Sequence, residues 1–287
     1  MNSRPASGGF GRSFHLAEYF GIEVRVHWSF AALVGGLGLW VLAETGSLEA
    51  VGRILIPIGM VFLCVVLHEY GHALTARHFG IRTRAITLLP IGGVAALERS
   101  PSSPAQELWI ALAGPAVNFL LAGLLFGVMT ATGGIASGLF SASGEASMLG
   151  WLFRLNLLLG TFNLLPALPM DGGRVLRASL ALRMSNLEAT RIASRAARGI
   201  AALMMVFGLM RGEWMLALIG GFVWSTAKAE LFQAMALEAL QAQRENRFGK
   251  TAQDSDVVME KTPAGEWGPP QSYRHSRRSD WPDDSWK

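Results

Sequence analysis

Charged residues are scarce in this sequence. They make up 16% of the 287 residues, whereas hydrophobic residues make up 51%, and soluble domains carry roughly 25% charged residues. So little charge excludes an ordinary water-facing surface for much of the chain. Cysteine is scarcer still, because Cys64 is the only one. A single cysteine excludes an intrachain disulfide and says nothing further about the compartment.

Long apolar runs are abundant. A helix needs about 20 predominantly apolar residues to cross a bilayer, and the runs do not alternate with the period of two that spanning strands require. We therefore predict an all-α polytopic membrane protein with about six transmembrane helices, located in the cell membrane. The six candidate spans are about 28–44, 53–78, 107–132, 149–170, 199–211 and 213–233.

The basic residues predict the orientation. All but three of the 25 Lys and Arg residues fall in the segments that this span order puts on one side: 1–27, 77–106, 171–198 and 228–287. Positive residues favour the cytoplasmic side, so we expect both termini there. The net charge of +4 then reflects the orientation of the protein in the membrane. No nucleic-acid partner is expected. No short apolar segment with a cleavage site precedes the first run, which we expect to be retained as a span.

Two stretches outside the spans have strand character. Residues 22–28, IEVRVHW, alternate apolar and polar side chains, as a short strand does. Residues 83–97, TRAITLLPIGGVAAL, are β-branched and apolar around Gly92 and Gly93 and predict a small β-hairpin soon after the second apolar run. The alternative is an ordinary loop that rests on the membrane surface.

The domain organisation follows from composition. We expect a cytoplasmic N-terminal segment with a short strand over 1–27, a transmembrane core over 28–235, and a disordered cytoplasmic tail over 236–287, which is rich in Pro, Gly, Ser and mixed charge. The tail contains Trp267, Trp281 and Trp286, so a partner-binding or membrane-touching role for it stays open.

The stretch HEYGH lies inside the second apolar run. His68 and His72 are four residues apart, so on a helix both imidazoles lie on one face and can reach a single metal ion. Glu69 lies beside them and can act as a general base. Ionisable residues within a span are costly and mark a functional site by default. The alternative is a polar contact between helices, for which one residue would suffice.

A third ligand candidate lies a hundred residues later, in NLLPALPMDGGR (163–174). Catalytic zinc usually has three protein ligands and an open position, and Asp171 ends an apolar run that Pro166 and Pro169 interrupt. Irregular backbone at membrane depth is tolerated where it lines an enclosed cavity. The expected topology puts His68, His72 and Asp171 at the same, cytoplasmic end of their spans.

HEYGH and NLLPALPMDGGR, in this order and in these spans, resemble the site-2 protease family of intramembrane zinc metalloproteases. The stretches AGPAVN (113–118) and GGVAAL (92–97) are similar too. The resemblance implies one Zn²⁺ per chain, with three ligands and one catalytic base. It also implies residues that hold substrate or the oxyanion. The implied ligands are His68, His72 and Asp171, the base is Glu69, and the substrate or oxyanion candidates are Asn163, Asn118, Gly92 and Gly93.

The expected function is therefore zinc-dependent endopeptidase activity within or near transmembrane helices of membrane protein substrates. The interval between the two motifs has no room for a PDZ domain and the tail none for paired CBS domains, so we expect a minimal form. An edge strand of the 83–97 hairpin, which contains Ile86 and Val94, is a candidate for holding an unwound substrate. The alternatives are a catalytically silent regulatory or binding protein of the same fold, and a transporter. The oligomeric state stays open.

Overall fold

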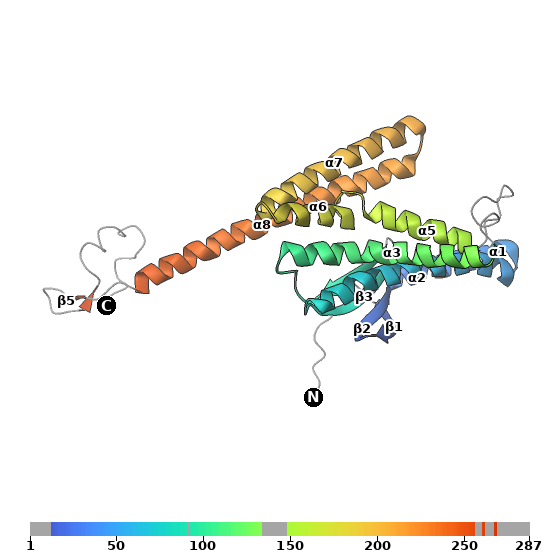
Figure 1. Cartoon of the computed structure of the whole chain (residues 1–287), viewed down its shortest axis with the longest axis horizontal. Coiled ribbons are helices and arrows are strands. Elements are labelled where there is room, and N and C mark those ends of the chain that lie inside the picture. The colour runs from blue at the N-terminus through green and yellow to red at the C-terminus, as the bar shows by residue number, and fades with distance from the viewer. Residues whose placement is uncertain (1–12, 91, 134–147, 256–259, 262–266, 269–287) are drawn as a thin grey trace. The chain divides into compact units, whose positions relative to one another are not determined.

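The computed structural model describes residues 13–90, 92–133, 148–255, 260–261 and 267–268 (Figure 1). The chain divides into two units, residues 1–231 and 232–287, and both the HEYGH stretch and Asp171 lie in the first. The elements are β1 (Ser13–Tyr19), β2 (Ile22–His27), α1 (Trp28–Thr45), α2 (Leu48–His78), β3 (Thr83–Leu89), β4 (Gly92–Leu97), α3 (Pro104–Ala131), α5 (Met148–Asn163), α6 (Asp171–Ala181), α7 (Asn186–Arg211), α8 (Trp214–Ser255), β5 (Glu260–Lys261) and β6 (Trp267–Gly268).

Five of the described helices are long and apolar enough to cross a membrane. Their apolar side chains stay largely exposed, as Leu39, Leu203 and Trp214 do at 69%, 72% and 69%, which is the pattern of helices that face lipid. The predicted class, a helical integral membrane protein with a small β element, is confirmed. The five helices are α1, α2, α3, α7 and α8 as far as Gln243.

Two expected spans have different bounds. The run over 149–170 forms the 16-residue helix α5 only as far as Asn163, because the chain then turns through the two prolines toward α6. The run over 199–211 is the end of α7, which starts at Asn186 behind a capping box of Ser185 and Glu188. The arginines in the first half of α7 concealed this start, since they lower the local hydropathy.

The tail prediction falls partly outside the described residues. Helix α8 continues to Ser255, that is, into the segment assigned to the tail, and Trp267 lies in the two-residue strand β6. Trp281 and Trp286 lie outside the residues that the structure describes, as do all of residues 1–12 and all of 256–287 except 260–261 and 267–268.

Strands β1 to β4 form a four-stranded sheet in the order β1-β2-β3-β4, and β5 pairs with β6. The predicted strand and hairpin are β2 and the β3–β4 pair, and β2 joins β3 in parallel while the other neighbours are antiparallel. Buried Ile22 and Ile86 of the sheet pack against Tyr70 and Ala73 of α2. The sheet therefore covers the half of α2 that contains the HEYGH stretch.

Strand β1 was not predicted. It pairs with β2 through a tight turn in which Phe20 and Gly21 both have positive φ, 56° and 75°. Two-residue hairpin turns of this kind are usually marked by Asn-Gly or Asp-Gly, and a phenylalanine in the first position gives no such signal. The turn is held to α2 by Arg77, whose guanidinium donates to the Phe20 carbonyl over 2.9 Å.

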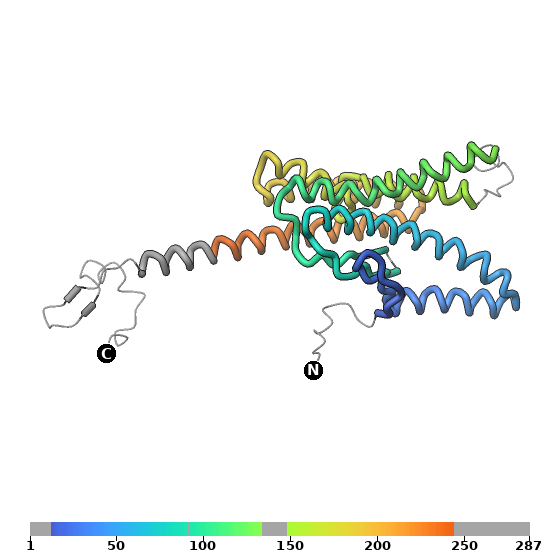
Figure 2. The backbone as a smooth tube through the Cα atoms, turned by 60° about the horizontal axis from the view of Figure 1, so that its bottom comes forward, coloured from blue at the N-terminus to red at the C-terminus, as the bar shows by residue number. Residues whose placement is uncertain are grey.

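Helices α2 and α3 approach each other closely beside the sheet, and α2 runs antiparallel to α1 (Figure 2). A Cβ atom at Gly71 of α2 would lie 2.7 Å from the Ala113 carbonyl oxygen and 2.8 Å from a methyl group of Val117. Such distances leave no room for any side chain. Glycine is therefore required where α2 crosses α3, as small residues are in membrane helix contacts generally.

Substitution Gly71→Leu is expected to separate α2 from α3 and to lower both thermal stability in detergent and metal content. Overpacking typically costs about 1–3 kcal/mol, and more is expected here because the obstacle includes backbone. The measurement is the unfolding temperature of purified protein together with zinc per chain. Gly59→Leu is the matched control, because a Cβ at Gly59 on the same helix meets nothing within 4 Å. Equal behaviour of the two variants would contradict the packing argument.

Candidate active site

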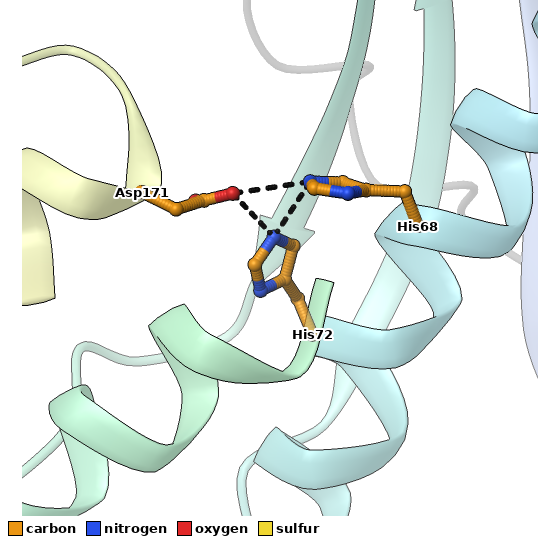
Figure 3. A group of neighbouring side chains, drawn as sticks. All are labelled: His68, His72 and Asp171. Atoms are coloured by element: carbon orange, nitrogen blue, oxygen red, sulfur yellow. Dashed lines mark hydrogen bonds and ion pairs between the residues drawn. The ribbon is translucent and has the colours of Figure 1, made fainter. Parts of the chain in front are cut away.

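Three ligand-type side chains converge where α2 meets α6 (Figure 3). His68 and His72 lie one turn apart on α2, and Asp171 is the first residue of α6. The two Nε2 atoms are 3.1 Å apart, and they lie 3.1 and 3.2 Å from the Asp171 Oδ2 atom. All three residues are buried, at 7%, 7% and 9% exposure. The structure thus brings together the three residues that the sequence singled out.

The spacing of these atoms fits a tetrahedral metal ion. Two ligand atoms at about 2.0–2.1 Å from zinc, with a tetrahedral angle between them, lie roughly 3.3–3.4 Å apart. The three observed distances of 3.1, 3.1 and 3.2 Å are close to that value. Three protein ligands leave a fourth position free, which is the arrangement of a catalytic site rather than a structural one.

Hydrogen bonds on the far side of each ring fix which nitrogen has the lone pair. The Nδ1 of His72 lies 2.6 Å from the Ile110 carbonyl oxygen, which can only accept, so this nitrogen donates. The Nδ1 of His68 lies 2.5 Å from the Asn118 side-chain oxygen and donates in the same way. In the neutral rings both Nε2 atoms then present lone pairs to each other and to the Asp171 carboxylate. Three acceptors at this distance repel one another unless a metal cation or a shared proton lies between them, and a metal ion satisfies all three at once.

A glycine on α3 makes the room for the two rings. A Cβ atom at Gly114 would lie 2.2 Å from the His72 Nε2 and 2.7 Å from the His68 Nε2. The helix backbone is therefore in direct contact with the ligand atoms. Gly114 belongs to the AGPAVN stretch, but its role was not predicted. The spacing of ligands along α2 does not reveal where the neighbouring helix must have no side chain.

Glu69 faces the same region from α2. It lines a cavity of about 600 Å³ together with His68 and Asp171. Strand β4 closes one side of this cavity so tightly that a Cβ atom at Gly93 would lie 2.7 Å from the Glu69 Cγ. The glutamate is thus held beside the ligand cluster, next to open space that a substrate can enter.

The remaining sequence-predicted candidates also line this cavity. Gly92 and Gly93 come from β4, Asn118 from α3, and Asn163 from the last residue of α5. Of the residues predicted for the site, His72 alone is not among those that line the cavity. The wall from α8, formed by Ile219, Phe222 and Val223, was not predicted.

The loop between α5 and α6 sets the position of Asp171. Ala167 and Leu168 are fully buried against small residues of α7 and α8, including Ala197 and Ala227. A Cβ atom at Gly172 would lie 2.2 Å from the Leu164 carbonyl oxygen, so the start of α6 packs directly on the loop backbone. The prolines end α5 early, and the loop is then fixed by α7 and α8.

Asn156 is a second residue that was not predicted. It lies in α5, is 0% exposed, and accepts a hydrogen bond from Asn118 over 3.0 Å. A polar side chain within the apolar stretch MLGWLFRLNLLLGTF was the available signal, since such residues in a span usually have a partner.

The sequence model of peptidase family M50 matches residues 57–139 and 133–207 of this chain. The chain belongs to peptidase family M50, and its resemblance to the site-2 proteases is confirmed. The matched residues include both His68 and Asp171, so the family match covers the cluster described above.

Individual relatives agree with the family match. The zinc metalloprotease MJ0392 of Methanocaldococcus jannaschii is 38% identical over 220 residues, which cover 76% of this chain and 60% of the relative. Rip3 of Mycobacterium tuberculosis is 35% identical over 232 residues, covering 75% and 58%. This chain thus spans about 60% of the length of these relatives. The solved structure of the site-2 protease from Methanocaldococcus jannaschii superimposes with a TM-score of 0.53 at 34% identity, covering 77% of this chain and 95% of that one.

Substitution Gly114→Ala is expected to abolish stable metal binding, because the added methyl group occupies the place of the ligand nitrogens. The displaced ligand nitrogens should lower the affinity for zinc at least 10-fold. The measurement is the amount of zinc per chain that remains after purification. The matched control is Gly123→Ala on the same helix, where a Cβ meets nothing within 4 Å. Full zinc content in Gly114→Ala would show that the rings and α3 do not meet as described.

Proposed function

We propose that this protein is a zinc-dependent endopeptidase that hydrolyses peptide bonds within or near the transmembrane helices of membrane proteins. The observation that carries the proposal is the triangle of His68, His72 and Asp171, with Glu69 beside it in one cavity. Membership of family M50 and the zinc metalloprotease among the relatives support it.

The proposed roles follow from the geometry. His68, His72 and Asp171 would hold the zinc ion, which supplies Lewis-acid polarisation of the scissile carbonyl and of the attacking water. Glu69 takes the proton from that water on its carboxylate and later delivers it to the leaving nitrogen. Asn163, at the cavity wall, is positioned to donate its side-chain N–H to the developing oxyanion.

The reaction requires an unwound substrate. In a helix the peptide groups are hydrogen-bonded within the chain and covered by side chains, so a substrate helix must open locally before a peptide bond can reach the ligand cluster. Its freed peptide groups then need partners. Strand β4 is the end strand of the sheet and lines the cavity through Gly92, Gly93 and Val94. It can supply those partners by pairing with the extended segment.

We further propose the location and orientation inferred from the sequence. The protein lies in the cell membrane with both termini and the site toward the cytoplasm, and the clustering of basic residues outside the expected spans supports this. Its partners are the lipid bilayer and membrane protein substrates. An aqueous path from the cytoplasmic side is required, because the reaction consumes water.

The proposal is tested by comparing metal content and cleavage in matched variants. Wild type is expected to bind about one zinc per chain, as three-ligand catalytic sites do. His68→Ala and Asp171→Ala should lose it. Glu69→Gln should keep zinc but cleave roughly 10²–10⁴-fold more slowly, which is the usual contribution of a general base.

For the cleavage assay, the protein is reconstituted in liposomes together with a panel of single-span membrane proteins. Newly formed chain termini are then identified by mass spectrometry. Zinc retained without any cleavage that depends on Glu69 would favour a catalytically silent relative. If the wild-type protein, purified without chelators, contains no zinc, the peptidase proposal is refuted and a transporter becomes the favoured function.

Strand addition is tested on β4 alone. The hairpin hypothesis included Ile86, but β3 pairs on both sides and Ile86 is fully buried, so a proline there would break the sheet. Val94 and Ala95 pair with Thr87 and Ile86, and neighbouring residues of an antiparallel strand alternate between inward and outward N–H groups.

One of the two substitutions Val94→Pro and Ala95→Pro therefore removes an outward donor and leaves the sheet intact. We expect this variant to keep its zinc and its unfolding temperature while turnover falls about 10-fold. A fall of this size corresponds to the loss of about one hydrogen bond between uncharged groups in the transition state. Val94→Ala and Ala95→Val keep the N–H and serve as controls. Wild-type turnover in the proline variant that preserves the sheet would refute strand addition.

A further inference from the structure

A chain of buried amides leads away from His68 into the membrane-spanning region. The His68 Nδ1 donates to the Asn118 oxygen over 2.5 Å, and the Asn118 amide nitrogen donates to the Asn156 oxygen over 3.0 Å. Both asparagines are 0% exposed. Two amides in a row, on two different helices, connect the ligand ring of α2 to α5.

The far end of this chain is anchored on an atom that can only accept. The Asn156 amide nitrogen donates to the Leu152 carbonyl oxygen over 2.9 Å and to the Cys64 sulfur over 3.3 Å. Because a backbone carbonyl has no hydrogen to donate, the NH₂ end of Asn156 must face Leu152. Its oxygen is then the end that faces Asn118.

This anchor determines the direction of every bond back to the site. The Asn156 oxygen requires the NH₂ end of Asn118, so the Asn118 oxygen faces His68, and the His68 Nδ1 must be the protonated nitrogen. The lone pair of His68 is thereby placed on Nε2, toward Asp171. For His72 a single hydrogen bond is enough. Its Nδ1 donates to the Ile110 carbonyl oxygen over 2.6 Å, so its lone pair is also on Nε2.

We propose that Asn156 is a positioning residue of the metal site, which acts through Asn118 to hold His68 in the tautomer that binds metal. The inference rests on the metal site of the proposed function but not on peptidase activity. The packing of α5 supports it: Asn156 and Gly160 are both buried and lie four residues apart, so they share one face of the helix, and Gly160 is in close contact with Phe119 of α3.

The test measures zinc dissociation constants of the full-length protein in detergent by competition with a chromophoric chelator. Asn156→Leu conserves volume but removes the acceptor for Asn118, so the Asn118 amide is free to turn its nitrogen toward His68. We expect zinc to bind about 10-fold more weakly, as is typical when a partner behind a metal ligand is lost. The absorption spectrum of the cobalt-substituted protein should shift as well, because the ring orientation changes.

Two comparisons separate positioning from packing. Cys64→Ala removes the other, weak acceptor of Asn156 at the same helix contact, and zinc affinity should stay within about 3-fold because the Leu152 carbonyl still orients the amide. In an Asn118→Ala background, Asn156→Leu should have no further effect on zinc affinity, since coupled residues are non-additive. A packing defect would weaken zinc equally in both backgrounds.

A loss of more than about 3-fold that disappears in the Asn118→Ala background supports the proposal. A smaller loss, or the same loss in both backgrounds, overturns it. If Asn156→Leu does not yield folded protein, Asn156→Ala is used in the same cycle with the same criteria. Wild type that binds no zinc would overturn the metal site itself, whereas wild type that binds zinc regardless of Asn156 would overturn this inference alone.

Discussion

Helices α2 and α3 meet so closely that the backbone of α3 touches the side chains of the metal site. Gly71 and Gly114 are the two positions where this contact leaves no room for a methyl group. The same contact brings the Ile110 carbonyl and the Asn118 amide to the far side of the two histidine rings. Ring orientation, tautomer and ligand spacing therefore all depend on the distance between these two helices.

The sequence predicted the parts of the site that have a local pattern. His68, Glu69 and His72 lie within one helical turn of each other, and Asp171 was noticeable as an acid at the end of an apolar run. The hairpin over 83–97 was also predicted, and it is the β3–β4 pair. Gly114, Asn156 and the α8 wall were not, because their roles depend on which helix lies opposite. The lengths of α5 and α7 were wrong for another reason. The run over 149–170 stays apolar past Asn163, where α5 ends, and the arginines of α7 lower the hydropathy of a helix that already begins at the Ser185 cap.

The site places polar groups at membrane depth without leaving them unpaired. Within the described residues around the ligands, each buried amide and imidazole has a partner, and the chain of partners ends on the backbone carbonyls of Ile110 and Leu152. Apolar surroundings make each of these hydrogen bonds costly to break. The result is a ligand set held in place by hydrogen bonds, beside the cavity that Glu69 and the β4 residues Gly92 to Val94 line.

The ligands come from two places that are far apart in the sequence. His68 and Asp171 are separated by 103 residues, and α3 and α5 are made and inserted between them. During synthesis the two histidines therefore enter the membrane well before the aspartate exists, and the ion cannot be held by all three ligands until α6 has followed. The order of the elements along the chain therefore delays completion of the ligand set until α3 and α5, which supply Asn118 and Asn156 behind His68, have been made. Helix α8, which lines the cavity, is made later still.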